Sequence, residues 1–126
     1  MKDLNSISGL IVDAAFHIHS TLGPGLLESV YEVILTHELE ERGLKVERQK
    51  AVPIEYEGIR FDEGFRADLI VEGCIVVELK SVEELAPVHS KQLLTYLRLL
   101  DLRLGLLNNF GAPVIKTGIR RIVNRL

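Results

Sequence analysis

The N-terminal third of the chain carries a hydrophobic pattern that predicts two helices. A first helix is indicated by apolar residues three and four positions apart, at Leu4, Ile7, Ile11, Ala14, Ala15, Ile18 and Leu22. The sequence Gly23-Pro24-Gly25 ends it. A second helical pattern runs from about Leu26 to Arg42, with Glu28 in its first turn and Gly43 as its stop.

The middle of the chain has the alternation and the β-branched content that strands favour. A hairpin is predicted from Val46 through Val52–Tyr56 to Phe61, with its tight turn at Glu57-Gly58. Two more strands, Phe65–Val71 and Cys74–Leu79, are rich enough in Val, Ile and Leu to be central. Their faces must therefore be covered by helices.

The last third predicts one helix and two strands. Pro87 suits a first helical turn, and spaced leucines extend that helix to about Asp101. Strands follow at Leu102–Phe110 and Val114–Val123, separated by Gly111-Ala112-Pro113. The predicted order, α-α-β-β-β-β-α-β-β, indicates an α/β or α+β architecture, a mixed β-sheet flanked by helices.

Composition places the chain among globular proteins of one domain, spanning residues 1–126. It has 126 residues, of which 47% are hydrophobic and 26% charged, enough for one core but not two. Apolar runs such as Ile75-Val76-Val77 are far shorter than the roughly 20 residues that cross a bilayer, so no membrane span is expected. The absence of a secretory signal pattern and the single cysteine, Cys74, favour a cytoplasmic location.

Charge is distributed unevenly along the chain. The net charge of −3 argues against a protein that coats nucleic acid by bulk charge. Up to Leu85, however, 8 basic residues face 17 acidic ones, whereas from Ala86 onward 7 basic residues face Asp101 alone. A basic C-terminal third, available for phosphate contacts, thus follows an acidic N-terminal part of the chain.

The most informative chemistry lies at the two central strands. Glu78 and Lys80 are two residues apart at the end of a buried strand and therefore share one face. A two-residue turn at Glu72-Gly73 would leave Asp68 on the opposite face from Glu78. We predict instead a three-residue loop, Val71-Glu72-Gly73, with Gly73 left-handed, which pairs Val76 with Asp68 and places both carboxylates diagonally on one face.

Two neighbouring carboxylates repel each other, and a divalent cation relieves that repulsion. Mg²⁺ prefers such oxygen ligands and keeps water for a substrate. Lys80 can then orient or deprotonate a water molecule, or neutralise charge on a phosphate. The alternative is a surface ion pair without catalytic meaning, and the spacing alone leaves both open.

Two helical clusters offer further candidates. Glu28 and Tyr31 share a helix face, although an acid there also suits the helix dipole and a tyrosine is often a core residue. Gln92 and Tyr96 share a polar face beside Lys91 that could hold a phosphate, a base or a water, or could simply be solvated. His19 could face the cavity of Glu28 or serve as a packing residue.

Taken together, the motifs resemble the GxxExxY family of the PD-(D/E)xK nuclease superfamily. The resemblance rests on Gly25-x-x-Glu28-x-x-Tyr31, Asp68, Glu78-x-Lys80 and Gln92-x-x-x-Tyr96, and it covers nearly the whole chain. It implies a restriction-endonuclease-like fold in which Glu28, Asp68, Glu78 and the Leu79 carbonyl bind Mg²⁺ or Mn²⁺. By the same resemblance Lys80 assists the attacking water, and Gln92 and Tyr96 complete the catalytic set.

Two functions are therefore weighed. The first is a Mg²⁺-dependent nuclease acting on DNA or RNA, with Tyr31, Lys91 and His19 as substrate contacts. The second is a nucleic-acid or protein interaction module that keeps this fold without turnover, a reading that the small size and acidic balance favour. A homodimer through an exposed helix or edge strand is compatible with either function.

Overall fold

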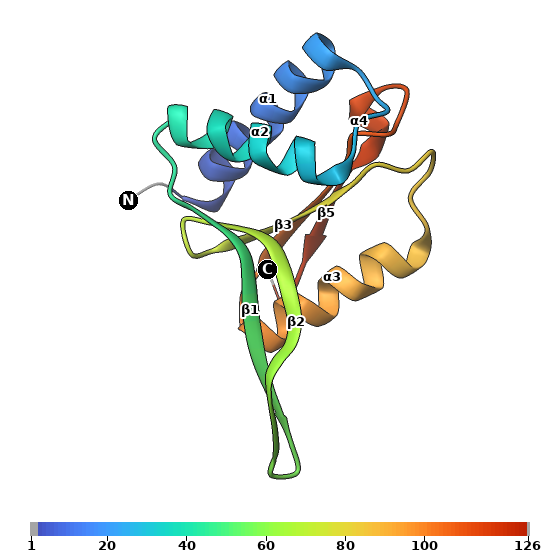
Figure 1. Cartoon of the computed structure of the whole chain (residues 1–126). Helices are drawn as coiled ribbons and strands as arrows, with labels where there is room; N and C mark the ends of the chain where they lie inside the picture. The colour runs from blue at the N-terminus through green and yellow to red at the C-terminus, as the bar shows by residue number, and fades with distance from the viewer. Residues whose placement is uncertain (1–2, 126) are drawn as a thin grey trace.

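A five-stranded sheet with helices on both faces makes up the computed structural model, which describes residues 3–125 (Figure 1). The elements are α1 (Leu4–Leu22), α2 (Glu28–Glu41), β1 (Val46–Tyr56), β2 (Ile59–Val71), β3 (Ile75–Lys80), α3 (Pro87–Leu100), β4 (Leu104–Asn109), α4 (Ile115–Gly118) and β5 (Ile119–Val123). This arrangement confirms the predicted mixed sheet flanked by helices.

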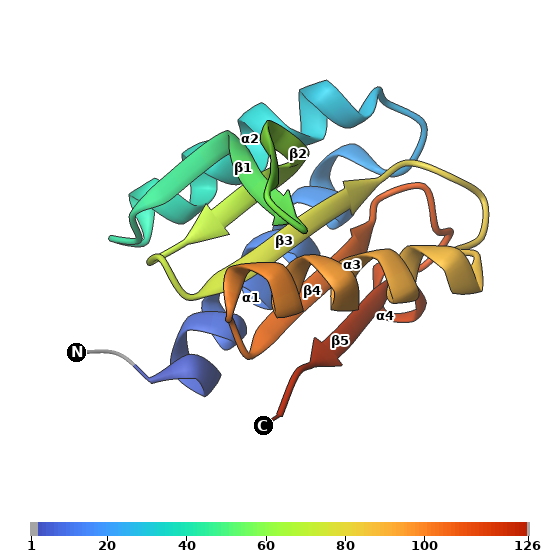
Figure 2. The ribbon, with the colours of Figure 1, turned by 90° about the horizontal axis from the view of Figure 1, so that it is seen from below.

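The sheet is ordered β1-β2-β3-β4-β5, and only β3 and β4 run parallel. A parallel pair needs a crossover connection, which α3 supplies on one face of the sheet. Helices α1 and α2 cover the other face (Figure 2). Because both faces are covered, every residue of β4 is buried, as are the first five of β3.

Two hydrophobic clusters lie on opposite faces of the sheet. The larger one joins α1 and α2 to the sheet and contains Ile11, Leu35, Val77 and Leu79 among its buried members. The smaller one joins α3 to the sheet through Leu93 and Leu97, among others. Glu78 therefore comes from a strand that is anchored on both sides, so its backbone is held rigidly.

Two predicted strand boundaries were wrong. The hairpin and the following strand were expected as separate elements, but β2 runs without a break through Gly64. A side chain at Gly64 would overlap that of Ile54 on the facing strand, so the glycine lets the hairpin continue rather than end. The predicted strand Val114–Val123 begins instead as the short helix α4, which buries Ile115.

The β1–β2 hairpin extends beyond the body of the protein as an arm, residues 53–64 (Figure 1). A register shift between Val52 and Ile54, at Pro53, marks its base. Three large apolar side chains of the arm are exposed, those of Tyr56, Ile59 and Phe61.

No helix among residues 3–125 is long and apolar enough to span a membrane.

Candidate active site

Asp68 and Glu78 lie side by side where β2 and β3 part. The backbone ladder between these strands ends with Leu69 opposite Val77. Beyond that point the backbone N–H groups donate to side-chain carboxyl groups instead of backbone carbonyls. The Asp68 N–H donates to Glu78 Oε1 at 3.3 Å, and the Leu79 N–H donates to Asp68 Oδ2 at 3.0 Å. The predicted proximity of the two carboxyl groups, called the acid pair below, is confirmed.

The loop that sets this proximity differs from the predicted one by one residue. Val71 pairs with Ile75, so the three loop residues are Glu72, Gly73 and Cys74 rather than Val71 to Gly73. Gly73 is left-handed as predicted, and Glu72 is left-handed as well, with φ of 54°. The Glu72 N–H donates to the Lys45 carbonyl, and the Lys45 N–H donates to the Glu72 carboxylate. With Val71 rather than Ile70 as the last paired residue of β2, Asp68 lies opposite Glu78 instead of diagonal to it.

Burial and the neighbouring charge of Asp68 change the acidity of Glu78. The pKa of Glu78 is raised to about 9, first because burial disfavours its charged form and second because Asp68 places a negative charge beside it. The nearby Lys80 ammonium opposes this shift. Without a cation, Glu78 thus keeps its proton at neutral pH.

Tyr96 of α3 faces the acid pair from the helix side. Burial raises its pKa first, and the charges of Glu78 and Asp68 raise it further. Its ring stacks on Phe65 of β2, with centroids 4.0 Å apart. The alternative of a simply solvated face therefore does not hold at Tyr96, which is half-buried and has one ring face covered, whereas Gln92 and Lys91 on the same helix are exposed.

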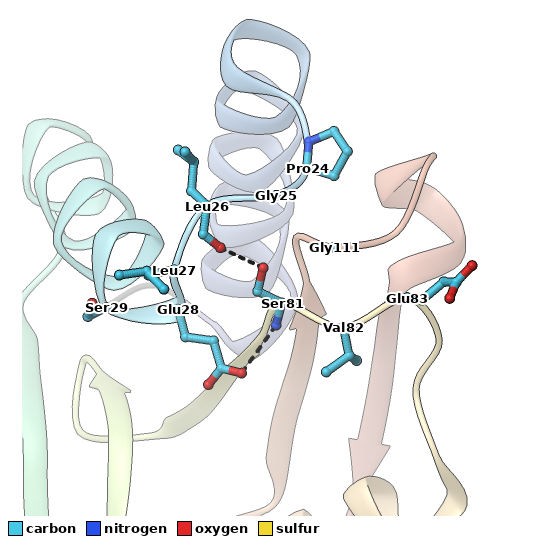
Figure 3. Close-up of a pocket in the computed structure, with 10 residues that line it drawn as sticks. All are labelled: Pro24, Gly25, Leu26, Leu27, Glu28, Ser29, Ser81, Val82, Glu83 and Gly111. Carbon is cyan, nitrogen blue, oxygen red and sulfur yellow. Dashed lines mark hydrogen bonds between the residues drawn. The ribbon is translucent and has the colours of Figure 1, made fainter.

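Glu28 approaches the end of β3 from the first turn of α2. Its Oε2 accepts a hydrogen bond from the Ser81 N–H at 3.3 Å, just beyond Lys80, while the Ser81 hydroxyl donates to the Leu26 carbonyl at 2.7 Å (Figure 3). A cavity of about 420 Å³ contains Glu28, Asp68 and Leu79 in its lining. Glu28 therefore shares a cavity with one member of the acid pair, although it is tied to the backbone of Ser81.

A second hollow adjoins the first. It measures about 770 Å³ and lies between the Gly23–Gly25 turn, the start of α2 and the segment after β3 (Figure 3). Glu28 and Ser29 line both hollows, so the second hollow meets the first at the start of α2. Leu26, Leu27 and Val82 make part of its wall apolar.

The acid pair fits a divalent metal ion. Among residues 3–125, no group of three His, Cys, Asp or Glu side chains lies close enough to hold one ion, so the predicted three-carboxylate site is not assembled there. Mg²⁺ is nevertheless commonly bound by one or two carboxylates and keeps several waters. A buried glutamate that stays protonated without a cation, next to a half-buried aspartate, has the chemistry of such a site.

Tyr31 and His19 make hydrogen bonds to loop backbone, and neither residue lines the two hollows. Tyr31 is fully buried and stacks on Phe110, with ring centroids 4.5 Å apart. Its hydroxyl donates to the Gly23 carbonyl at 2.6 Å and accepts from the Leu26 N–H at 3.2 Å. His19 Nε2 lies 2.8 Å from the Ala112 carbonyl. The expected substrate contact is unavailable to Tyr31, because its ring and hydroxyl are both engaged in the fold.

Removing the Tyr31 hydroxyl is expected to loosen this turn. Tyr31→Phe deletes two hydrogen bonds of a buried group, so the free energy of unfolding should fall by about 1 to 2 kcal/mol. Urea denaturation measures this change. Tyr56→Phe, at an exposed tyrosine of the arm, is the matched control and should leave stability unchanged; equal effects of the two variants would contradict the structural role.

Sequence reasoning missed several residues at the site. Glu32, Arg48 and Gln49 line the same cavity as Asp68 and lie too far apart in the chain for spacing to connect them. Asn109 was detectable, because it ends the buried strand β4 as Lys80 ends β3, and the two residues pair in the ladder. Its side-chain oxygen accepts from the N–H groups of Val82 and Gly111, which fixes the segment after Lys80.

Three arginines of the basic C-terminal third lie away from the acid pair. Arg103 and Arg125 lie at the end of β4 and β5 where Leu104 pairs with Ile75, away from the acid pair. Arg121 is bonded to Asn5 and lies near the Ser8 hydroxyl, both in α1. The arm is acidic, with four acids and Arg60. Arg103, Arg121 and Arg125 therefore do not supply phosphate contacts beside the acid pair, whereas Lys80 lies close to Glu78.

The fold and site together define a class: a restriction-endonuclease-like α/β protein with two carboxylates and a lysine where two central strands diverge. The chain belongs to the PD-(D/E)XK nuclease superfamily, whose family model matches residues 5–122. Comparisons with curated proteins and with solved structures gave no match. Superfamily membership implies a nucleic-acid substrate, and nucleases of this kind generally use divalent metals.

Proposed function

We propose that this protein is a Mg²⁺-dependent nuclease that hydrolyses phosphodiester bonds in DNA or RNA at the acid pair. The observation that carries the proposal is the contact between Asp68 and Glu78 at the point where β2 and β3 diverge, within reach of the charge of Lys80. Membership of the nuclease superfamily supports it. Placement in the GxxExxY family, a cytoplasmic location and a homodimer stay predictions.

Asp68 and Glu78, with the Leu79 carbonyl, are the groups that would hold the cation. Bound there, a divalent cation supplies charge neutralisation and Lewis-acid activation of the scissile phosphate. The acid pair alone repels a polyanion, so substrate should approach productively only after its charge is offset. Glu28, which lines the same cavity as Asp68, is proposed to hold a water bound to the metal ion and not to bind the ion directly.

Lys80 is proposed to serve the attacking water. Its ammonium lies close enough to Glu78 to lower the pKa of that carboxyl, and a cation in this position can hydrogen-bond the water or stabilise charge developing on the phosphate. Gln92 is proposed to orient the same water from α3. Lys91, one residue earlier and exposed, is proposed to contact a phosphate of the substrate.

A panel of nucleic acids tests the proposal. Purified protein should cleave at least one of single- or double-stranded DNA or RNA with Mg²⁺ or Mn²⁺, and EDTA should abolish cleavage.

Lys80→Met should lower kcat about 100-fold because the water loses its partner, with little change in metal affinity. Metal-independent cleavage would contradict the proposal. Nucleic-acid binding without metal binding or turnover would favour the interaction module instead.

A further inference from the structure

Gln49 of β1 has a backbone conformation that its residue type rarely adopts. Its φ is 49°, in the left-handed region that non-glycine residues generally avoid. The ladder between β1 and β2 pairs Arg48 with Leu69 and Lys50 with Ala67 but omits Gln49 and Asp68 between them. The strained conformation therefore occurs directly beside the aspartate of the acid pair. Such strain persists where surrounding contacts hold it in place.

The Gln49 side chain joins two carboxylates. Its Nε2 donates to Glu32 Oε1 and to Asp68 Oδ1, the latter at 3.3 Å. A glutamine amide has two N–H donors, and both are directed at acids here, which also fixes which end of the amide faces them. Asp68 is consequently held at both oxygens, because the Leu79 N–H bonds to Oδ2.

An ion pair between the buried Glu32 and the exposed Arg48 anchors the other end of this bridge. Glu32 of α2 is only 6% exposed. Its Oε2 accepts from Nη2 and Nε of Arg48, at 3.0 and 3.2 Å. A buried carboxylate must be paired, and Arg48 offsets its charge. Glu32 can then hold the Gln49 amide without adding an unbalanced negative charge next to Asp68.

We propose that Gln49 is a positioning residue that, braced by the Glu32–Arg48 ion pair, fixes the Asp68 carboxylate in the orientation needed to bind a divalent cation with Glu78. The inference rests on the proposed function and extends it to a residue that touches neither the cation nor the substrate. Groups that orient metal ligands in this way commonly change metal affinity 10- to 100-fold when removed.

Gln49→Gly removes the side-chain amide at a position where glycine is not strained. Glycine accepts a positive φ readily, so this variant should fold, with relief of the backbone strain offsetting part of the loss of the two amide hydrogen bonds. It removes the bridge to Asp68, however, so the Kd for Mn²⁺, measured by titration calorimetry on the full chain, should rise about tenfold or more. Gln49→Met, close in size but without the N–H donors and without a new charge, should also weaken Mn²⁺ binding because Asp68 Oδ1 loses its donor.

Glu57→Gly is the matched control. Glu57 is also a non-glycine residue at positive φ, 47°, but it lies at the tip of the arm, away from the acid pair. This variant should keep the Mn²⁺ affinity of the wild type. An unchanged Mn²⁺ Kd in both Gln49 variants, with normal binding by the wild type, overturns the positioning role alone. Absence of Mn²⁺ binding by the wild type overturns the proposed metal site and this inference with it.

Discussion

Glu78→Gln is expected to lower the kcat of Mg²⁺-dependent cleavage by about 1,000-fold or more. The substitution keeps the size of the side chain and a partner for the Asp68 N–H, but it removes one of the two acid-pair carboxylates that would offset the charge of the cation. Single-turnover cleavage of the best substrate in the panel measures the effect. KM should change much less than kcat, because Glu78 is not proposed to grip the remote parts of the substrate.

The control is a glutamate outside the site. Glu40 is exposed on α2, and Glu40→Gln changes the net charge by the same amount. It should retain wild-type kcat and wild-type dependence on Mg²⁺. Cleavage by Glu78→Gln at the rate of the wild type would remove the acid pair from the mechanism, and with it the assignment of the reaction to this end of the sheet.

The stability of the metal-free protein should fall as the pH rises through the neutral range, and Glu78 should be the main cause. In the folded protein the pKa of Glu78 is about 9, against 4.5 for an unperturbed glutamate. Between those values the folded state holds a proton that the unfolded chain has released. A rise in pH therefore favours unfolding, by up to about 1.4 kcal/mol per pH unit. Below about pH 4.5 both states are protonated and the full contribution is present.

Glu78→Gln should flatten this dependence. Its amide stays neutral at every pH, so the variant should exceed the wild type by more than about 2 kcal/mol at pH 8, and the gap should close toward pH 4. Denaturation in EDTA at several pH values measures the two curves, with Glu40→Gln following the wild type. Parallel curves for Glu78→Gln and the wild type would show that Glu78 is ionised in the metal-free protein.

The sequence predicted the fold well because the periodicity of its apolar residues changes with the element. The stripe at Ile7, Ile11 and Ile18 is buried in α1 as expected, and the apolar runs of β3 and β4 are central strands. The errors fell where local signals compete. The residues around Gly64 were expected to separate two strands, but Gly64 makes room for the Ile54 side chain and the strand continues. Ile115 was expected in a strand but lies in the short helix α4, and the sequence has no signal that marks where this helix ends and β5 begins.

The candidate site could be predicted only in part. Asp68, Glu78 and Lys80 are close in sequence, and strand alternation connects them once the loop is fixed. The contacts of Gln49 with Glu32 and with Asp68 depend on how α2 packs over the sheet and on a strained backbone at one residue. Neither has a periodic signature. Tyr31 shows the opposite case, in which a motif residue serves the fold instead of the substrate.

The most direct test is anomalous diffraction from crystals of the protein grown with Mn²⁺. We expect a manganese peak between the carboxylates of Asp68 and Glu78, with the Leu79 carbonyl among its ligands and Glu78 deprotonated by the ion. Density showing the two carboxyl groups still hydrogen-bonded to their present partners, with manganese absent or bound only elsewhere, would contradict it.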